Sequence, residues 1–403
     1  MSIFSRTALL AGALCISGTA AYAAPVTLAD ALSQGSEVSP RIAQAKAQAE
    51  AAEARARQAG VSPNPEIGVV VENFGGSGPY RSFRTSETTF ELSQRFEMGG
   101  KRGARLAVAG AERDFAALSY VRAGADLARD IRIAHAELRA AEDRAVLARD
   151  SVKQAQDLSR TAGLMVDAGR DPPLRKLRAD ALLADALAEE ARTFGALLSS
   201  RRYLASLIGS DDPDLSAGDA RDQALPPEPP HDMPSLDERL AQAERDAALG
   251  RIKVAQAAAV PDITASGGVR RFGEGRETAI IAGISIPFPI RDRNRGGIAA
   301  ARSDSIASEA SLAQTRLDAR RAQHDAAMLL GAAEERVAAL SGPGATQAEE
   351  AVRLARIGYQ AGKFSLVELI DAQIALNSAR VALIQARLDR ARAFADLLRA
   401  NAQ

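Results

Sequence analysis

The sequence contains helical stretches that are too long for a compact domain. From Gly103 to Met165 there is no proline, and residues that favour helices dominate. At ~1.5 Å per residue, one helix of that length would extend on the order of 90 Å. Alanine, leucine, arginine and glutamate dominate the whole chain, while aromatic residues make up only 4% of it. This composition favours long helices and coiled coils over a compact enzyme core.

The same order of elements occurs twice along the chain, which indicates an internal duplication. Each half begins with a capped helix, in which Thr27 is followed by Asp30 and Ser235 by Glu238. A pair of β-like segments, a long helical stretch, an Ala-Gly break and a second long helix follow in both halves. We therefore predict a signal peptide at 1–23, a first repeat at 24–209 with a strand pair at 66–97, a proline-rich surface linker at 210–234, and a second repeat at 235–403 with a strand pair at 262–288.

The first residues have the pattern of a secretory signal. Arg6 is followed by an apolar run and by the small-residue cleavage pattern Ala21-Tyr22-Ala23. That run is too short to span a bilayer, although an uncleaved anchor remains an alternative. Cys15 is the only cysteine, and the residue before it is Leu14, where a lipidation signal requires a small residue. We expect a mature chain from near Ala24, without disulfide or thiol chemistry.

Four short segments resemble strands: three alternate apolar and polar residues, as strands with one buried face do, and Asp262–Phe272 shows a weaker pattern and contains glycine. Each has about nine to eleven residues, the length of a tilted membrane-spanning strand. Four strands cannot close a barrel, and lipid does not tolerate an open sheet edge, so three chains with twelve strands would be required. A soluble four-stranded sheet remains the alternative. The segments are Glu66–Phe74, Thr88–Phe96, Asp262–Phe272 and Thr278–Phe288.

The last helix, from about Ser365 to Ala400, carries two apolar seams with coiled-coil spacing. Two adjacent seams allow a helix to pack against a neighbour on each side, so a ring of such helices would close into a hollow cylinder. A buried helix in a soluble bundle would also have a wide apolar face. One seam is Leu369, Ala372, Leu376, Ala379, Leu383, Ala386, Ala393 and Leu397; the other is Ile370, Ile374, Val381, Ile384, Leu388, Ala391, Ala395 and Leu398.

Several motifs resemble the outer-membrane efflux protein family, whose members are TolC-like. The first strand begins with Asn64-Pro65-Glu66, and Glu97–Arg102 forms the turn from the second strand into the long helix. Both segments resemble the heavy-metal cation branch of the family, typified by CzcC and CusC. The most specific match is Gly358–Gln373, which resembles the family's periplasmic-tip signature. The resemblance covers essentially the whole mature chain.

The resemblance implies a mostly α-helical protein with a small β part, assembled as a homotrimer. A twelve-stranded β-barrel would lie in the lipid of the outer membrane, and a helical cylinder, closed at its tip, would extend into the periplasm. A periplasmic adaptor bound to an inner-membrane RND pump would open it. The chain would then be a passive exit duct for heavy-metal cations, without catalysis or cofactor.

The tip carries the candidate functional residues. In the family, acidic side chains near the start of the last helix ring the closed pore, and Glu368 and Asp371 occupy those positions. Two residues three apart on a helix share a face, so both carboxylates could line a cation-selective gate. Gly169 and Gly362 are expected to stop helices. The residues that we assign to a tip latch or an adaptor contact are Arg170, Arg175, Lys176, Arg178, Tyr359, Gly169 and Gly362.

Other function classes find little support in the sequence. The 51 basic and 51 acidic residues balance, which argues against a nucleic-acid partner. The three histidines are scattered, and the sequence has no phosphate-binding loop, nucleophile motif or metal-ligand cluster. We therefore predict no enzyme activity and no resident metal. The alternatives are a multidrug or organic-solute duct of the same fold, a periplasmic adaptor, or a structural coiled-coil protein.

Overall fold

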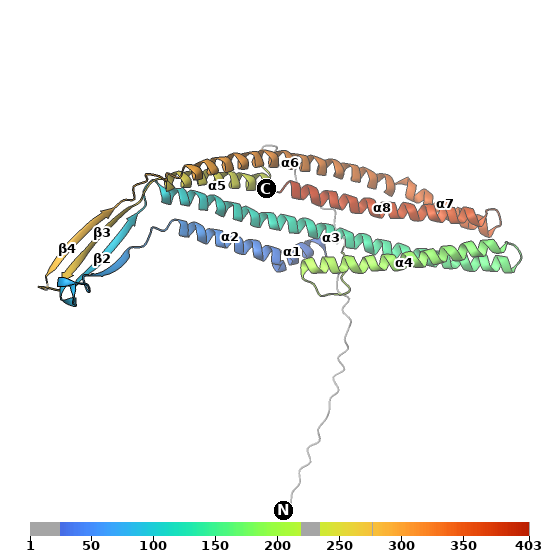
Figure 1. The fold of residues 1–403 in the computed structure, drawn as a ribbon. Helices are drawn as coiled ribbons and strands as arrows, with labels where there is room; N and C mark the ends of the chain where they lie inside the picture. The colour runs from blue at the N-terminus through green and yellow to red at the C-terminus, as the bar shows by residue number, and fades with distance from the viewer. Residues whose placement is uncertain (1–24, 219–233, 276, 403) are drawn as a thin grey trace, which may run out of the picture.

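The computed structural model describes residues 25–218, 234–275 and 277–402. The predicted signal peptide and most of the predicted linker lie outside these ranges. The molecule is elongated, with a small sheet at one end, two hairpin turns at the other and long helices between them (Figure 1). The helices are α1 Leu28–Val38, α2 Pro40–Ala59, α3 Lys101–Asp167, α4 Pro173–Ile208, α5 Leu236–Ala258, α6 Arg295–Ser341, α7 Pro343–Gln360 and α8 Leu366–Ala400.

Each half combines one long helix with shorter helices placed end to end. In the first half, α1 and α2 continue the line of α4, and in the second half α5 continues the line of α8 (Figure 1). At the first joint, a side chain at Gly209 would lie 2.8 Å from Val38 Cγ2, so the two segments abut closely. At the second joint, the Leu236 amide donates to the Ala402 carbonyl at 2.8 Å. Long helices alongside the joints, such as α3, hold both segments in line.

Two helix breaks were not predicted from the sequence. Pro40 begins α2 after Ser39, whose backbone is extended, so the first capped helix consists of two pieces. Pro343 likewise begins α7 after Gly342 and divides the long helical stretch of the second half. Proline lacks the amide hydrogen that a helix interior requires, and its ring clashes with the preceding turn. Both prolines therefore start new helices.

The sheet has four antiparallel strands in the order β1-β2-β3-β4, so strands from both halves meet at β2 and β3. The register places Ile67, Phe90, Val269 and Ile280 on one face. That face is exposed in the single chain, where 83% of Ile67 and 88% of Ile280 is accessible. The strands are β1 Glu66–Glu72, β2 Glu87–Phe96, β3 Ile263–Phe272 and β4 Thr278–Ser285, and two short 3-10 helices, Gly78–Tyr80 and Phe83–Thr85, lie between β1 and β2.

Two strands end earlier than predicted. The first was expected to reach Phe74, but Asn73 has a left-handed backbone with φ +57°, which ends β1 at Glu72. The last was expected to reach Phe288, but β4 ends at Ser285, shortly before Pro287. Proline cannot donate a hydrogen bond to a strand ladder. The alternation of apolar and polar residues extends further along the sequence than the ladder itself.

The beginning of the linker is packed against the helices, whereas the whole linker was predicted to lie on the surface. Leu215 and Ala217 belong to the same buried cluster as Leu138 of α3. Ala217 also forms a parallel bridge with Val26, which brings the start of the first half beside the start of the linker. The buried His135 ring lies 3.0 Å from the Val26 carbonyl, and burial lowers the pKa of that ring. A neutral histidine therefore stabilises this junction.

The two predicted seams of α8 differ in burial. Leu369 and Leu376 of the first seam are buried within the chain. The second seam is buried at Ile384 and Leu388, but Ile374 and Val381 remain exposed. Asn377, which interrupts the second seam, donates to Ser151 Oγ of α3 at 3.0 Å. The first seam and the C-terminal part of the second thus hold α8 within the chain, and the exposed part of the second, at Ile374 and Val381, is available to a neighbour.

Candidate functional site

The two hairpin turns lie together at the end of the molecule that is opposite to the sheet (Figure 1). One turn joins α3 to α4, and the other joins α7 to α8. A buried cluster of Leu158, Ala179, Tyr359, Leu366 and Leu369 packs the first hairpin against the second. The tip residues predicted from the two repeats are therefore brought to one place.

The two turns have the same backbone geometry. Gly169 and Gly362 follow the helix ends with φ of +70° and +71°, a left-handed conformation that favours glycine. In the first turn the Arg170 amide donates to the Met165 carbonyl at 2.9 Å, and in the second the Lys363 amide donates to Gly358 at 2.8 Å. The prediction that both glycines stop helices is confirmed.

A polar contact joins the two turns. The Tyr359 hydroxyl donates to Asp171 Oδ2 at 3.2 Å, and Arg175 forms an ion pair with the other oxygen of the same carboxylate. Only 7% of the Asp171 side chain is exposed. Burial raises the pKa of Tyr359, and the charge of Asp171 raises it further, so the hydroxyl stays protonated as a donor. Asp171 was not among the predicted site residues; the only sequence signal was its position before the Pro172-Pro173 turn.

Lys176 binds within its own hairpin. Its ammonium group lies 2.5 Å from Asp180 Oδ1 and 3.3 Å from Ser159 Oγ. The Lys176 ammonium and the Ser159 hydroxyl together lower the pKa of the Asp180 carboxyl. Within the single chain, Arg175 and Lys176 therefore pair with first-half acids, and a latch from either residue to Glu368 or Asp371 stays a prediction.

The predicted gate acids have different surroundings. Glu368 accepts a hydrogen bond from the Ser365 amide at 2.6 Å, while the Ser365 hydroxyl accepts one from the Glu368 amide at 3.3 Å. This reciprocal capping box fixes the start of α8. Asp371 lies exposed one turn further on. Arg170 and Arg178 are exposed too, and within the described ranges no side chain pairs with them.

The equivalent positions of the two hairpins carry opposite charges. When the turns are aligned on Gly169 and Gly362, Arg175 corresponds to Glu368 and Arg178 to Asp371. The two hairpins therefore share a backbone but present a basic and an acidic helix start. Opposite charges at equivalent positions can attract across an interface, whereas like charges would repel.

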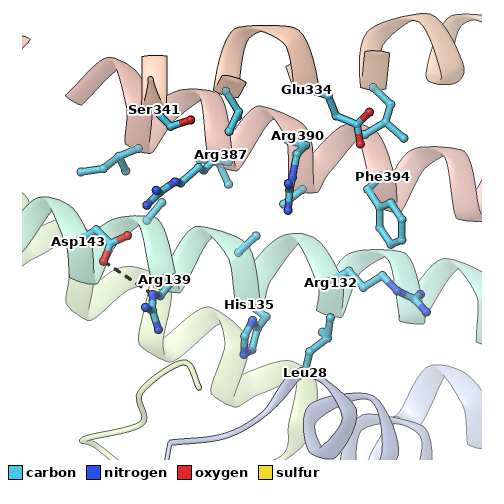
Figure 2. Close-up of a pocket in the computed structure, with 17 residues that line it drawn as sticks. Leu28, Arg132, His135, Arg139, Asp143, Glu334, Ser341, Arg387, Arg390 and Phe394 are labelled. Carbon is cyan, nitrogen blue, oxygen red and sulfur yellow. Dashed lines mark ion pairs between the residues drawn. The ribbon is translucent and has the colours of Figure 1, made fainter. Parts of the chain in front are cut away.

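A second candidate site is a cavity of 670 Å³ between α3, α6 and α8 (Figure 2). Arg387 and Arg390 point from α8 toward α3, which contributes Arg132 and Arg139. Arg139 lies 3.7 Å from Asp143, and burial lowers the pKa of Arg132. Since four guanidinium groups outnumber the carboxylates of Asp143 and Glu334, the cavity does not suit a metal cation.

In the described ranges, no group of three or more His, Cys, Asp or Glu side chains is placed to hold a metal ion. None of the helices in residues 25–218, 234–275 and 277–402 is both long and apolar enough to cross a membrane.

Comparison with known proteins gives a consistent result. The sequence profile described as "Outer membrane efflux protein" matches residues 31–210 and 235–402. The chain is 34% identical over 334 residues to the nickel and cobalt resistance protein CnrC of Cupriavidus metallidurans. The aligned region covers 79% of this chain and 79% of CnrC. It is 29% identical over 367 residues to the cobalt-zinc-cadmium resistance protein CzcC of the same organism, covering 89% of this chain and 86% of CzcC.

Solved structures share the fold. A membrane protein from Pseudomonas aeruginosa superposes with a TM-score of 0.81 at 21% identity, covering 93% of this chain and 90% of the other. The outer membrane protein VceC from Vibrio cholerae superposes with a TM-score of 0.77 at 21% identity, covering 93% of this chain and 95% of VceC. CusC, a transmembrane channel protein, superposes with a TM-score of 0.76 at 18% identity, covering 93% of this chain and 92% of CusC.

The Tyr359–Asp171 contact can be tested without disturbing the packing around it. In Tyr359→Phe the ring remains in the buried cluster but the hydrogen bond is lost, which removes ~1 kcal/mol of local stability. We expect amide hydrogen exchange in both turns to accelerate roughly fivefold, as measured by mass spectrometry. Tyr203→Phe, an exposed tyrosine of α4, is the matched control. Unchanged exchange in Tyr359→Phe would show that the contact does not hold the turns together.

Proposed function

The chain belongs to the outer membrane efflux protein family, and we propose that it is the exit duct of a tripartite efflux system that exports heavy-metal cations. The observation that carries this proposal is the combination of an exposed amphipathic sheet at one end with paired helical hairpins at the other. A soluble protein would leave the apolar face of the sheet in water, whereas a membrane duct would place it in lipid.

A trimer would supply the strand partners that the two edges of the sheet lack in the single chain. β1 and β4 are edge strands, whose backbone groups have no partner on one side. Hydrocarbon does not solvate such groups, so a sheet in a membrane must close on itself. Three copies, with β4 of one against β1 of the next, give a closed barrel of twelve strands. The polar face, with Glu91 and Arg270, would then line the lumen.

The helices would form the periplasmic part of the duct. α3 has 67 residues, so it extends on the order of 100 Å at ~1.5 Å per residue. Exposed apolar side chains along the outside of the hairpins, such as Phe194 of α4 and Ile374 of α8, are available to the next chain. Placed end to end, the eight helices of one chain form four columns, so three chains would supply twelve columns for a cylinder that runs from the outer membrane into the periplasm.

The hairpin tip is the proposed gate and the contact for partners. Glu368 and Asp371 would face the pore axis, and Arg170 and Arg178 would pair with them across chains, since neither base has a partner within the described chain. Exposed ion pairs contribute only about 0–1 kcal/mol each, so such a latch is released readily. A periplasmic adaptor, itself bound to an inner-membrane RND pump, would dock on the turns at Gly169 and Gly362.

The proposed cargo rests on the relatives. CnrC and CzcC are named for resistance to nickel, cobalt, zinc and cadmium. The described residues provide no group of metal ligands, and a duct that bound its cargo tightly would retain it. Selection among cations would therefore lie in the pump, and the duct would supply a path with a favourable charge.

The test of this function is a deletion strain complemented with the wild-type chain. We expect deletion to reduce growth in nickel, cobalt, zinc or cadmium and complementation to restore it, measured as minimal inhibitory concentrations. Dyes and antibiotics are screened on the same plates. Sensitisation to dyes and antibiotics alone would refute metal cargo, and a soluble monomer in membrane fractionation would refute the duct.

The proposed gate makes a separate prediction. A carboxylate about 8 Å from a passing cation attracts it by ~2 kcal/mol at an effective dielectric constant of ~20. In Asp371→Asn we therefore expect the cation-to-anion permeability ratio to fall about fivefold or more, measured from reversal potentials in planar bilayers. Asp325→Asn, an exposed acid within α6, is the control. An unaltered ratio in Asp371→Asn would exclude this residue from the pore.

A further inference from the structure

Two consecutive arginines of β3 lie on opposite faces of the sheet. Arg270 belongs to the polar face, where it spans three strands: it lies 3.1 Å from Glu72 of β1 and, on β2, 3.1 Å from Glu87 and 3.0 Å from Thr89. Its charge is thus neutralised within the chain. Successive residues of a strand point to opposite faces, so Arg271 belongs to the apolar face.

The strand register gives the surroundings of Arg271. It pairs with Thr88 on one side and with Thr278 on the other, and Thr88 pairs in turn with Val71. Arg271 is exposed, and among residues 25–218, 234–275 and 277–402 no carboxylate forms an ion pair with it. The Arg271 guanidinium therefore lies on the apolar face without an ion-pair partner among the described residues.

Its position along the strand is informative. The next row toward the helices consists of Val69, Phe90, Val269 and Ile280, all apolar. Arginine on the lipid face of a barrel is strongly destabilising at the bilayer midplane but is tolerated near the interface. Arg271 thus marks the end of the apolar band that lies furthest from the helices.

The neighbouring subunits do not provide the counter-charge through strand pairing. β3 lies between β2 and β4 of its own chain, and only β1 and β4 are edges. The connection between β1 and β2 lies against Gly273, two residues after Arg271. The Gly273 amide donates to the Ser86 carbonyl at 2.8 Å, and a side chain at Gly273 would lie 2.6 Å from the Arg84 carbonyl oxygen. A second guanidinium, that of Arg84, is therefore carried at the same end of the sheet, 4.0 Å from Glu274.

We propose that Arg271 binds a phosphate group of a membrane lipid in the leaflet that faces the cell exterior. This inference rests on the proposed membrane barrel, which places the apolar face in lipid. The planar guanidinium donates two parallel hydrogen bonds to phosphate oxygens, and the partly dehydrated interface strengthens them. Lipid phosphate supplies the missing counter-charge at the depth where Arg271 emerges from the apolar band.

The experiment uses the full-length protein, purified as a trimer and placed in phosphatidylcholine nanodiscs. Lipid A, which carries two phosphates, is titrated, and the number retained per trimer is counted by native mass spectrometry. We expect Arg271→Gln to weaken retention about tenfold, the loss of one charge-assisted contact, and Arg271→Lys to keep part of it. Dephosphorylated lipid A should bind the wild type no better than it binds Arg271→Gln.

Two controls separate this site from general charge effects. Arg95→Gln removes an exposed arginine of the polar face and should leave lipid retention unchanged. Inorganic phosphate alone, at the same concentration, should not displace lipid A. Equal retention by Arg271→Gln and the wild type, equal loss in Arg95→Gln, or displacement by inorganic phosphate would each overturn the proposal. A wild-type chain that yields no trimer would instead refute the proposed function.

Discussion

The structure depends on one constraint, namely that a single chain cannot satisfy its own sheet. The four strands leave two edges unpaired and expose a face that carries Ile67, Phe90 and Ile280. Water would solvate the edges but not the face, and lipid would solvate the face but not the edges. The proposed closure with further copies in a membrane would satisfy both. The helices would then have to follow the symmetry of the closed sheet.

At the helical end, the contacts within one chain differ from those that neighbouring chains would make. The two turns share their glycine geometry, and the contact between Tyr359 and the buried Asp171 holds them together within each chain. Arg178 and Asp371 occupy equivalent positions with opposite charges. In a ring, bases of one hairpin type would alternate with acids of the other. Strong contacts would thus form inside the subunit and weak, releasable contacts between subunits, as a gate requires.

Much of the fold could be predicted from the sequence, because the strands and long helices have regular patterns of apolar residues. Alternating residues predicted β1, β2 and β4 clearly and the glycine-containing β3 more weakly, and a proline-free stretch predicted the longest helix. The breaks at Pro40 and Pro343 were missed because each flanking stretch was interpreted as one helix, although proline is favoured at the first position of a new helix. The role of Asp171 depends on a tertiary contact, because its partner Tyr359 lies 188 residues away in the second hairpin. The Ser365–Glu368 capping box is local and follows the S-x-x-E pattern, so the sequence could have shown it.

The most direct test of the account is disulfide crosslinking between β1 and β4. The chain has one native cysteine, Cys15, so Val69→Cys can be combined in turn with cysteine at Thr278, Ile280, Ala282 and Ile284. Within one chain, β1 and β4 lie about 14 Å apart, too far for a bond. Paired strands of neighbouring subunits lie about 5 Å apart, so one combination should yield covalent trimers in the outer membrane. Monomers alone in all four combinations would contradict the closed barrel.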